Sequence, residues 1–127
     1  MLRRKNARGF TLIELIVVMA IIAMLLTLAM PKYFNSVERG REAVLRHDLR
    51  VMREAIDQFY ADRGAWPTSL QELADRRYLR QVPPDPLTDS ATTWVVLAPP
   101  PGAGSGVYDV RSGADGQSLD GEQYAQW

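Results

Sequence analysis

The chain has 127 residues, 15 basic against 15 acidic side chains, one histidine and no cysteine. This length favours one domain, and the lack of cysteine excludes a disulfide framework, a thiol nucleophile and cysteine-based zinc or iron–sulfur sites. A single histidine cannot build a multi-histidine metal centre, and a formal net charge of zero argues against a nucleic-acid binder driven by positive charge.

The first thirty residues divide into a short basic leader and an apolar run. Residues 1–9 carry four basic side chains and no acid, whereas residues 10–30 hold 18 apolar side chains out of 21. About 20 helical residues cross the apolar core of a bilayer, so the run predicts one transmembrane helix. Basic flanks stay in the cytoplasm, which places the rest of the chain on the other side of the membrane. The run is too long for the core of a secretory signal peptide, and no small-x-small cleavage site follows it.

Glu14 lies inside this apolar run, where a carboxylate costs about 2.5–3.5 kcal/mol at a helix centre and less near a helix end. No basic side chain lies between Phe10 and Met30 to neutralise it. Cleavage after Gly9 would give Phe10 a free ammonium group that could pair with Glu14 of the same or a neighbouring chain. The alternative is an interfacial glutamate whose carboxylate reaches the lipid headgroups. The residues by themselves leave both interpretations open.

The sequence Gly9-Phe10-Thr11-Leu12-Ile13-Glu14, after a basic leader and before an apolar run, resembles the processing signal of type IV pilin-like proteins. This resemblance implies that a prepilin peptidase cuts between Gly9 and Phe10 and then N-methylates Phe10. It also implies that Glu14 pairs with the N-terminus of an adjacent subunit during filament assembly. The implied fold is an α+β lollipop, in which a long N-terminal helix packs on a small head.

The region after the apolar run is predicted to continue the same helix with a kink. Pro31 lacks an amide hydrogen and its ring crowds the carbonyl of Thr27, so the kink is expected between these two residues. An apolar stripe then recurs at helical spacing: Leu45, Leu49, Met52, Ile56 and Phe59. A basic last turn followed by Gly64 indicates the end of the helix. Together these signals predict one helix from about Phe10 to Asp62.

The stem part of this helix carries a mixed set of charges. Arg46, Arg50 and Arg53 share one helical face, which could bind DNA or anionic lipid. Five acids are interleaved with them: Glu38, Glu42, Asp48, Glu54 and Asp57. The sequence therefore favours a charged face that contacts solvent or other subunits. His47 lies among these charges and is expected at the surface.

The remainder is predicted to form a head with a short helix and an antiparallel β-hairpin. Two pairs could form the capping box that opens the helix: Thr68 with Gln71, or Ser69 with Glu72. This helix should end near Arg77, and the prolines of residues 83–86 predict a rigid connector. Strands are expected at residues 92–98 and 107–111. The Pro- and Gly-rich loop between them, residues 99–106, is too long for a tight turn.

Two stretches of the head extend the resemblance to the G-type pseudopilins of type II secretion systems: GAWPTSLQELADRRYL with VPPDP after it, and the end VYDVRSGADGQSLDGEQYAQW. Many such proteins hold calcium in a C-terminal loop, which implies a site within residues 112–122 with Asp115 and Asp120 as ligands and Glu122 in reserve. Calcium takes six to eight oxygen ligands, which two carboxylates and loop carbonyls could largely supply. Asp-Gly pairs also favour turns without any metal, so the metal-free interpretation stays open.

These observations predict a structural subunit rather than an enzyme, because there is no histidine beyond His47, no cysteine and no Ser/His/Asp constellation. The resemblance implies a periplasmic pseudopilus that drives type II protein secretion. Its partners would be the prepilin peptidase, identical or related pseudopilins and the inner-membrane secretion platform, and no nucleic acid. The protein would cross the inner membrane once, with its N-terminus in the cytoplasm and its C-terminal domain in the periplasm. The alternatives are a type IV or competence pilus pilin and, more distantly, a membrane-anchored periplasmic binding domain.

The predicted division of the chain has four parts: a cleaved leader at residues 1–9, a transmembrane and filament-core helix at 10–31, a periplasmic stem helix at 32–63, and a globular head at 64–127.

Overall fold

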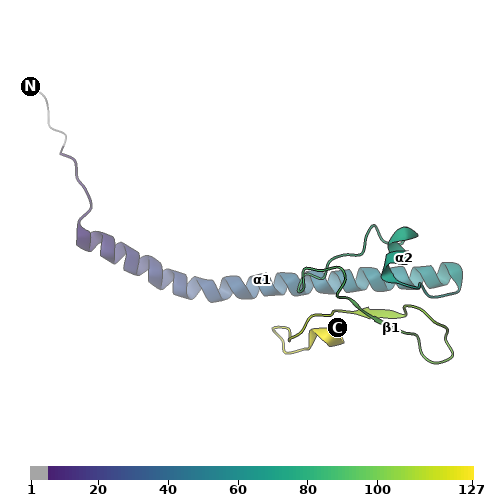
Figure 1. The fold of residues 1–127 in the computed structure, drawn as a ribbon. Coiled ribbons are helices and arrows are strands. Elements are labelled where there is room, and N and C mark those ends of the chain that lie inside the picture. The colour runs from purple at the N-terminus through teal and green to yellow at the C-terminus, as the bar shows by residue number, and fades with distance from the viewer. Residues whose placement is uncertain (1–5) are drawn as a thin grey trace, which may run out of the picture. The chain divides into compact units, whose positions relative to one another are not determined.

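The structure is a computed structural model that describes residues 6–127, and the chain divides into two compact units, one ending at Ser36 and the other covering Val37–Trp127. The elements in chain order are α1 (Leu12–Arg63), α2 (Leu70–Asp75), β1 (Val95–Leu97), β2 (Asp109–Arg111) and the short 3-10 helix η1 (Tyr124–Gln126). They make the α+β fold predicted from the sequence, with one long N-terminal helix, a short helix and an antiparallel pair of strands (Figure 1).

Helix α1 continues through Pro31 without interruption, so the proline lies inside the helix as predicted. The kink expected beside it stays a prediction. The helix begins two residues later than expected, at Leu12, and ends at Arg63. Gly64 follows with a φ of 69°, and its N–H donates to the carbonyl of Tyr60 at 2.8 Å. A glycine in this left-handed conformation ends the helix at low cost.

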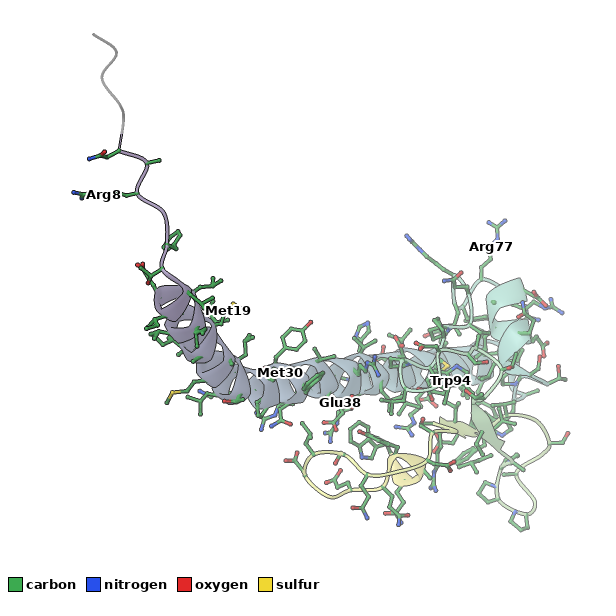
Figure 2. All side chains as sticks on the ribbon, turned by 60° about the vertical axis from the view of Figure 1, so that its left-hand side comes forward. Arg8, Met19, Met30, Glu38, Arg77 and Trp94 are labelled. Carbon is green, nitrogen blue, oxygen red and sulfur yellow. The ribbon has the colours of Figure 1, made fainter. Side chains whose placement is uncertain are left out.

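The part of α1 in the first unit exposes its apolar side chains. This is the one helix of the described chain that is long and apolar enough to cross a membrane, by length and composition, and none of its most apolar stretch is buried. Figure 2 shows Met19 projecting freely from this part of the helix. A contiguous apolar surface of this kind requires lipid or other protein chains to cover it.

The core of the second unit forms where the apolar stripe of α1 meets the head. All five stripe residues predicted from the spacing are buried: Leu45, Leu49, Met52, Ile56 and Phe59. The head contributes buried side chains from α2, the hairpin and the segments beside them: Leu70, Leu73, Leu79, Trp94, Val107 and Val110. Each such side chain contributes about 1.5–3 kcal/mol on burial, so this seam is the main source of cohesion in the second unit.

Helix α2 begins with one of the two predicted capping pairs. Ser69 is the N-cap, and its Oγ accepts a hydrogen bond from the Glu72 N–H at 3.2 Å. The Glu72 carboxylate accepts from both the N–H and the hydroxyl of Thr68, each at 2.7 Å. It thus reaches one residue further back than in the usual box. The two bonds from Thr68 lower the pKa of Glu72.

The C-terminus of α2 comes at Asp75, two residues earlier than predicted. Arg77 adopts a left-handed φ of 64°, and its N–H donates to the carbonyl of Ala74 at 3.1 Å. The Tyr78 N–H donates to the carbonyl of Leu73 at 2.8 Å. These two bonds form a Schellman motif, with arginine at the position that usually holds glycine. Figure 2 shows the Arg77 side chain projecting away from the head.

The predicted hairpin is present, but both strands are shorter than expected. They pair antiparallel over Val95–Leu97 and Asp109–Arg111 instead of residues 92–98 and 107–111. Trp94 is buried, and its indole N–H donates to the carbonyl of Pro83 at 2.7 Å. The N–H of Val107 donates to the carbonyl of Pro67 at 2.7 Å. The residues flanking the strands therefore bond to other parts of the head instead of extending the ladder.

Candidate functional site

The predicted cleavage point lies in an exposed segment in front of α1. Gly9 and Phe10 lie outside any helix or strand, and Phe10 is 83% exposed. Figure 2 shows Arg8 on the same segment, while leader residues 1–5 lie outside the described part of the chain. A peptidase could reach the Gly9–Phe10 bond without unwinding a helix. Cleavage there and methylation of Phe10 stay predictions.

Glu14 takes part in a capping box that the sequence interpretation did not include. Its N–H donates to the Thr11 hydroxyl at 3.1 Å, and the Thr11 N–H points back to the Glu14 carboxylate at 3.5 Å. The sequence pattern that predicts such a box is Thr-x-x-Glu before an apolar run. This box sets the start of α1 at Leu12 and places the carboxylate at the positive end of the helix dipole. In the uncleaved chain, Glu14 therefore already has a partner of its own.

Known proteins share this N-terminal sequence and much of the rest of the chain. Residues 4–30 match the family model of the prokaryotic N-terminal methylation motif. The chain is 28% identical to the type II secretion system core protein G of Pseudomonas aeruginosa, over 91% of this chain and 89% of that protein. With its counterpart in Escherichia coli K12 the identity is 26%, over 94% of this chain and 90% of that protein. The chain therefore carries the N-terminal methylation motif and is similar to core protein G of type II secretion systems over most of its length.

Other pilin-like proteins match a smaller part of the chain. The fimbrial protein EcpC of Eikenella corrodens is 38% identical, over 47% of this chain and 39% of that protein. No solved structure matches the chain significantly. The methylation motif and the one apolar helix among the described residues are those of a single-pass, membrane-anchored protein.

In the second unit of this pilin-like chain, Glu42 of α1 holds the C-terminal segment. Its side chain is only 8% exposed, and its Oε1 accepts hydrogen bonds from the Leu119 N–H and the Tyr124 hydroxyl, both at 2.9 Å. The sequence interpretation counted Glu42 among the interleaved surface acids. The spacing in the sequence indicates this burial, because Glu42 lies three residues before Leu45 and so falls on the same helical face as the buried stripe.

Arg46 contacts the same C-terminal segment. It lies 3.5 Å from the carboxylate of Glu122, and its guanidinium lies over the indole ring of Trp127, 4.1 Å from the ring centroid.

Arg53 donates to the Asp109 carboxylate at 2.8 Å and to the carbonyl oxygens of Val110 and Trp127 at 2.9 and 2.5 Å. Arg46 is exposed to solvent, as predicted, but it also contacts the C-terminal segment, whereas Arg53 is partly buried against the head instead of facing solvent. Their partners lie more than 50 positions away in the sequence, beyond the reach of helical spacing rules. His47 is exposed, as predicted.

Asp85 is a fully buried acid that ties the proline-rich connector to the end of β2. Its two carboxylate oxygens accept from the Leu87 N–H at 2.9 Å and from the Ser112 hydroxyl at 2.5 Å. The Ser112 oxygen in turn accepts from the Ala114 N–H at 3.1 Å. Asp85 thereby helps to position the start of the C-terminal loop. The sequence predicts a rigid connector from its prolines, but it does not predict that the acid within the connector is buried.

The loop implied as a calcium site exposes both of its predicted ligands, Asp115 and Asp120. Asp115 lines a groove of about 290 Å³ with Gly116, Gln117 and Gln123, whereas Asp120 does not line it. Among residues 6–127, no group of three or more His, Cys, Asp or Glu side chains is placed to hold a metal ion. Calcium binding by Asp115 and Asp120 stays a prediction, and backbone carbonyls would have to supply most of the ligands.

The contact between Tyr124 and Glu42 predicts a specific response to alkaline pH. Burial, then the hydrogen bond to Glu42 and its charge, raises the pKa of Tyr124 to about 12. A group with a raised pKa stabilises the fold below its unfolded pKa of about 10 and loses this contribution as the pH rises through the folded value. We expect the melting temperature to fall between about pH 10 and 12 more steeply in the native protein than in Tyr124→Phe. Ultraviolet titration should show one tyrosine ionising later than the others; five coincident titrations would contradict this.

Proposed function

We propose that this chain is a structural subunit of a type II secretion pseudopilus. The observation that carries the proposal is the methylation motif at residues 4–30, combined with similarity to core protein G over more than nine tenths of the chain. Prepilin peptidase would cut between Gly9 and Phe10 on the cytoplasmic side of the inner membrane and N-methylate Phe10. The mature chain would then wait in the membrane, anchored by residues 10–31, with its head in the periplasm.

Assembly would transfer the apolar part of α1 from lipid into a filament core. Its exposed apolar side chains supply the cohesion between subunits, since their burial against neighbouring helices is favourable. Glu14 would pair with the N-terminal amine of an adjacent subunit and so set the register of the helices. A polar group in an apolar seam commonly acts in this way, through specificity more than through stability. The secretion platform and related pseudopilins would be the partners in this step.

The second candidate is a pilin of a type IV or competence pilus. Similarity to fimbrial proteins supports it, with 38% identity to the Eikenella corrodens protein and 36% to a Neisseria meningitidis protein. These similarities extend over 47% and 49% of this chain, whereas those to core protein G of Pseudomonas aeruginosa and Escherichia coli extend over 91% and 94%. The proportion of the chain that is matched therefore favours the pseudopilus.

Mass spectrometry of the protein isolated from membranes tests the proposal. In cells with an active prepilin peptidase, we expect a chain that begins at N-methylated Phe10 and lacks residues 1–9. The matched control is the same protein from cells without the peptidase, which should retain the leader. An unprocessed N-terminus in the presence of active peptidase would overturn the proposal. Loss of secreted proteins rather than of surface pili in a deletion strain would separate the two candidates.

A further inference from the structure

We infer that Glu42 orders the C-terminal loop of this chain, residues 112–127, so that the loop holds its fold without a bound cation. The inference concerns the second unit by itself and does not depend on the proposed role in secretion. In the proteins that this chain resembles, calcium is expected to order this loop; here a side chain of α1 would do so.

The first support is that Glu42 contacts two residues of the loop, Leu119 and Tyr124. A single oxygen, Oε1, accepts from the backbone of Leu119 and from the hydroxyl of Tyr124, which fixes both ends of the turn to a rigid helix. Hydrogen bonds to an ionised acceptor are shorter and stronger than those between neutral groups. No ion pair among the described residues includes Glu42, so these two donors are the partners that compensate its burial.

The second support is that the loop already uses its own oxygens. The carbonyl oxygens of Gly116, Ser118 and Glu122 accept from the N–H groups of Tyr124, Gly121 and Ser118, at 3.2, 3.0 and 2.7 Å. The Ser118 hydroxyl accepts from the Glu122 N–H at 3.2 Å. These hydrogen bonds close the loop on itself. Two of its three exposed acids, Asp115 and Asp120, take no part in any side-chain hydrogen bond or ion pair that the described residues make, and the third, Glu122, pairs with Arg46.

The third support is the row of stem residues that continues from Glu42. Arg46 lies one turn further along α1 and contacts Glu122 and Trp127, and Arg53 lies two turns beyond it and contacts the end of the segment. One face of α1 therefore contacts residues 112–127 at three positions, Glu42, Arg46 and Arg53. These contacts are made by side chains of the same chain, so they do not depend on the concentration of a free ion.

Hydrogen exchange of the full-length protein in detergent micelles tests the inference, measured with calcium and with a calcium chelator. We expect exchange of the amides at residues 118–124 to be the same in both conditions. Glu42→Ala should raise their exchange about tenfold or more in both, since it removes two charge-assisted hydrogen bonds. Glu38→Ala is the matched control, because Glu38 is a partly exposed acid one turn earlier whose carboxylate lies 3.9 Å from Arg41; it should leave the loop unchanged.

Tyr124→Phe is a second, milder variant that tests the same contact if the Glu42→Ala protein unfolds as a whole. It removes one donor and keeps the ring, so exchange should rise within residues 118–124 while the amide of Val110 in the core stays protected. Faster exchange of the native loop on removing calcium would overturn the inference, because a cation would then order the loop. Native-like protection of the loop in both Glu42→Ala and Tyr124→Phe would also overturn it.

Discussion

Replacing Glu14 with alanine is expected to stop filament assembly and to leave cleavage after Gly9 intact. Moving the helix from lipid into a filament would bury the amine of Phe10 among apolar side chains without a carboxylate beside it. An unpaired charge in such surroundings costs about 2.5–3.5 kcal/mol, which lowers an assembly constant by roughly a hundredfold. The measurement is the amount of filament sheared from cells or formed from purified processed subunits, with the mature N-terminus verified by mass.

Two further variants separate the charge of Glu14 from its role in the capping box with Thr11. Glu14→Gln can still cap the helix, since glutamine serves at this position, but it carries no charge. Thr11→Ala keeps the charge and removes the hydroxyl that accepts from the Glu14 N–H. If pairing with the amine drives assembly, Glu14→Gln fails and Thr11→Ala assembles. The reverse pattern would show that the helix cap, and not the charge, is needed for assembly, and normal filaments from Glu14→Ala would show that neither is needed.

Replacing Gly113 with alanine is expected to destabilise the second unit by at least about 3 kcal/mol, beyond the usual range for a point substitution. A Cβ at this position would lie 1.9 Å from the carbonyl oxygen of Thr93 and 3.0 Å from its carbonyl carbon. Both contacts are with backbone, so no side-chain rotation can relieve them. Thr93 and Gly113 flank the paired ends of β1 and β2, and separating them would pull the hairpin apart.

Tryptophan fluorescence provides a selective readout of this change, because all three tryptophans lie in Val37–Trp127. A loss of about 3 kcal/mol should lower the melting temperature by more than about 10 °C for a unit of this size. Gly40→Ala is the control of opposite sign: nothing lies within 4 Å of its added Cβ, and alanine in a helix interior should stabilise by about 1 kcal/mol. A Gly113→Ala protein that melts within a few degrees of the native protein would contradict the close approach.

Prediction from the sequence worked where the controlling interactions are local or periodic. The buried stripe of α1 follows from 3.6-residue periodicity, and the Ser69–Glu72 cap follows from bonds within one turn. The predicted strands are too long because β propensity does not reveal competing backbone partners, such as the Pro67 carbonyl that accepts from the Val107 N–H. Arg77 shows the same limit at a helix end, since nothing in its side chain favours a left-handed backbone.

The two features on which the proposed function depends are readable from the sequence: the methylation motif around Gly9, Phe10 and Glu14, and the apolar run after it. Both consist of neighbouring residues whose chemistry is evident without a fold. The roles of the charges in the stem depend instead on contacts that form only in the folded chain. Glu42 and Arg53 look like solvated surface residues in the sequence, but folding brings each against partners more than 50 positions away, where burial and hydrogen bonding turn them into the supports of the C-terminal segment.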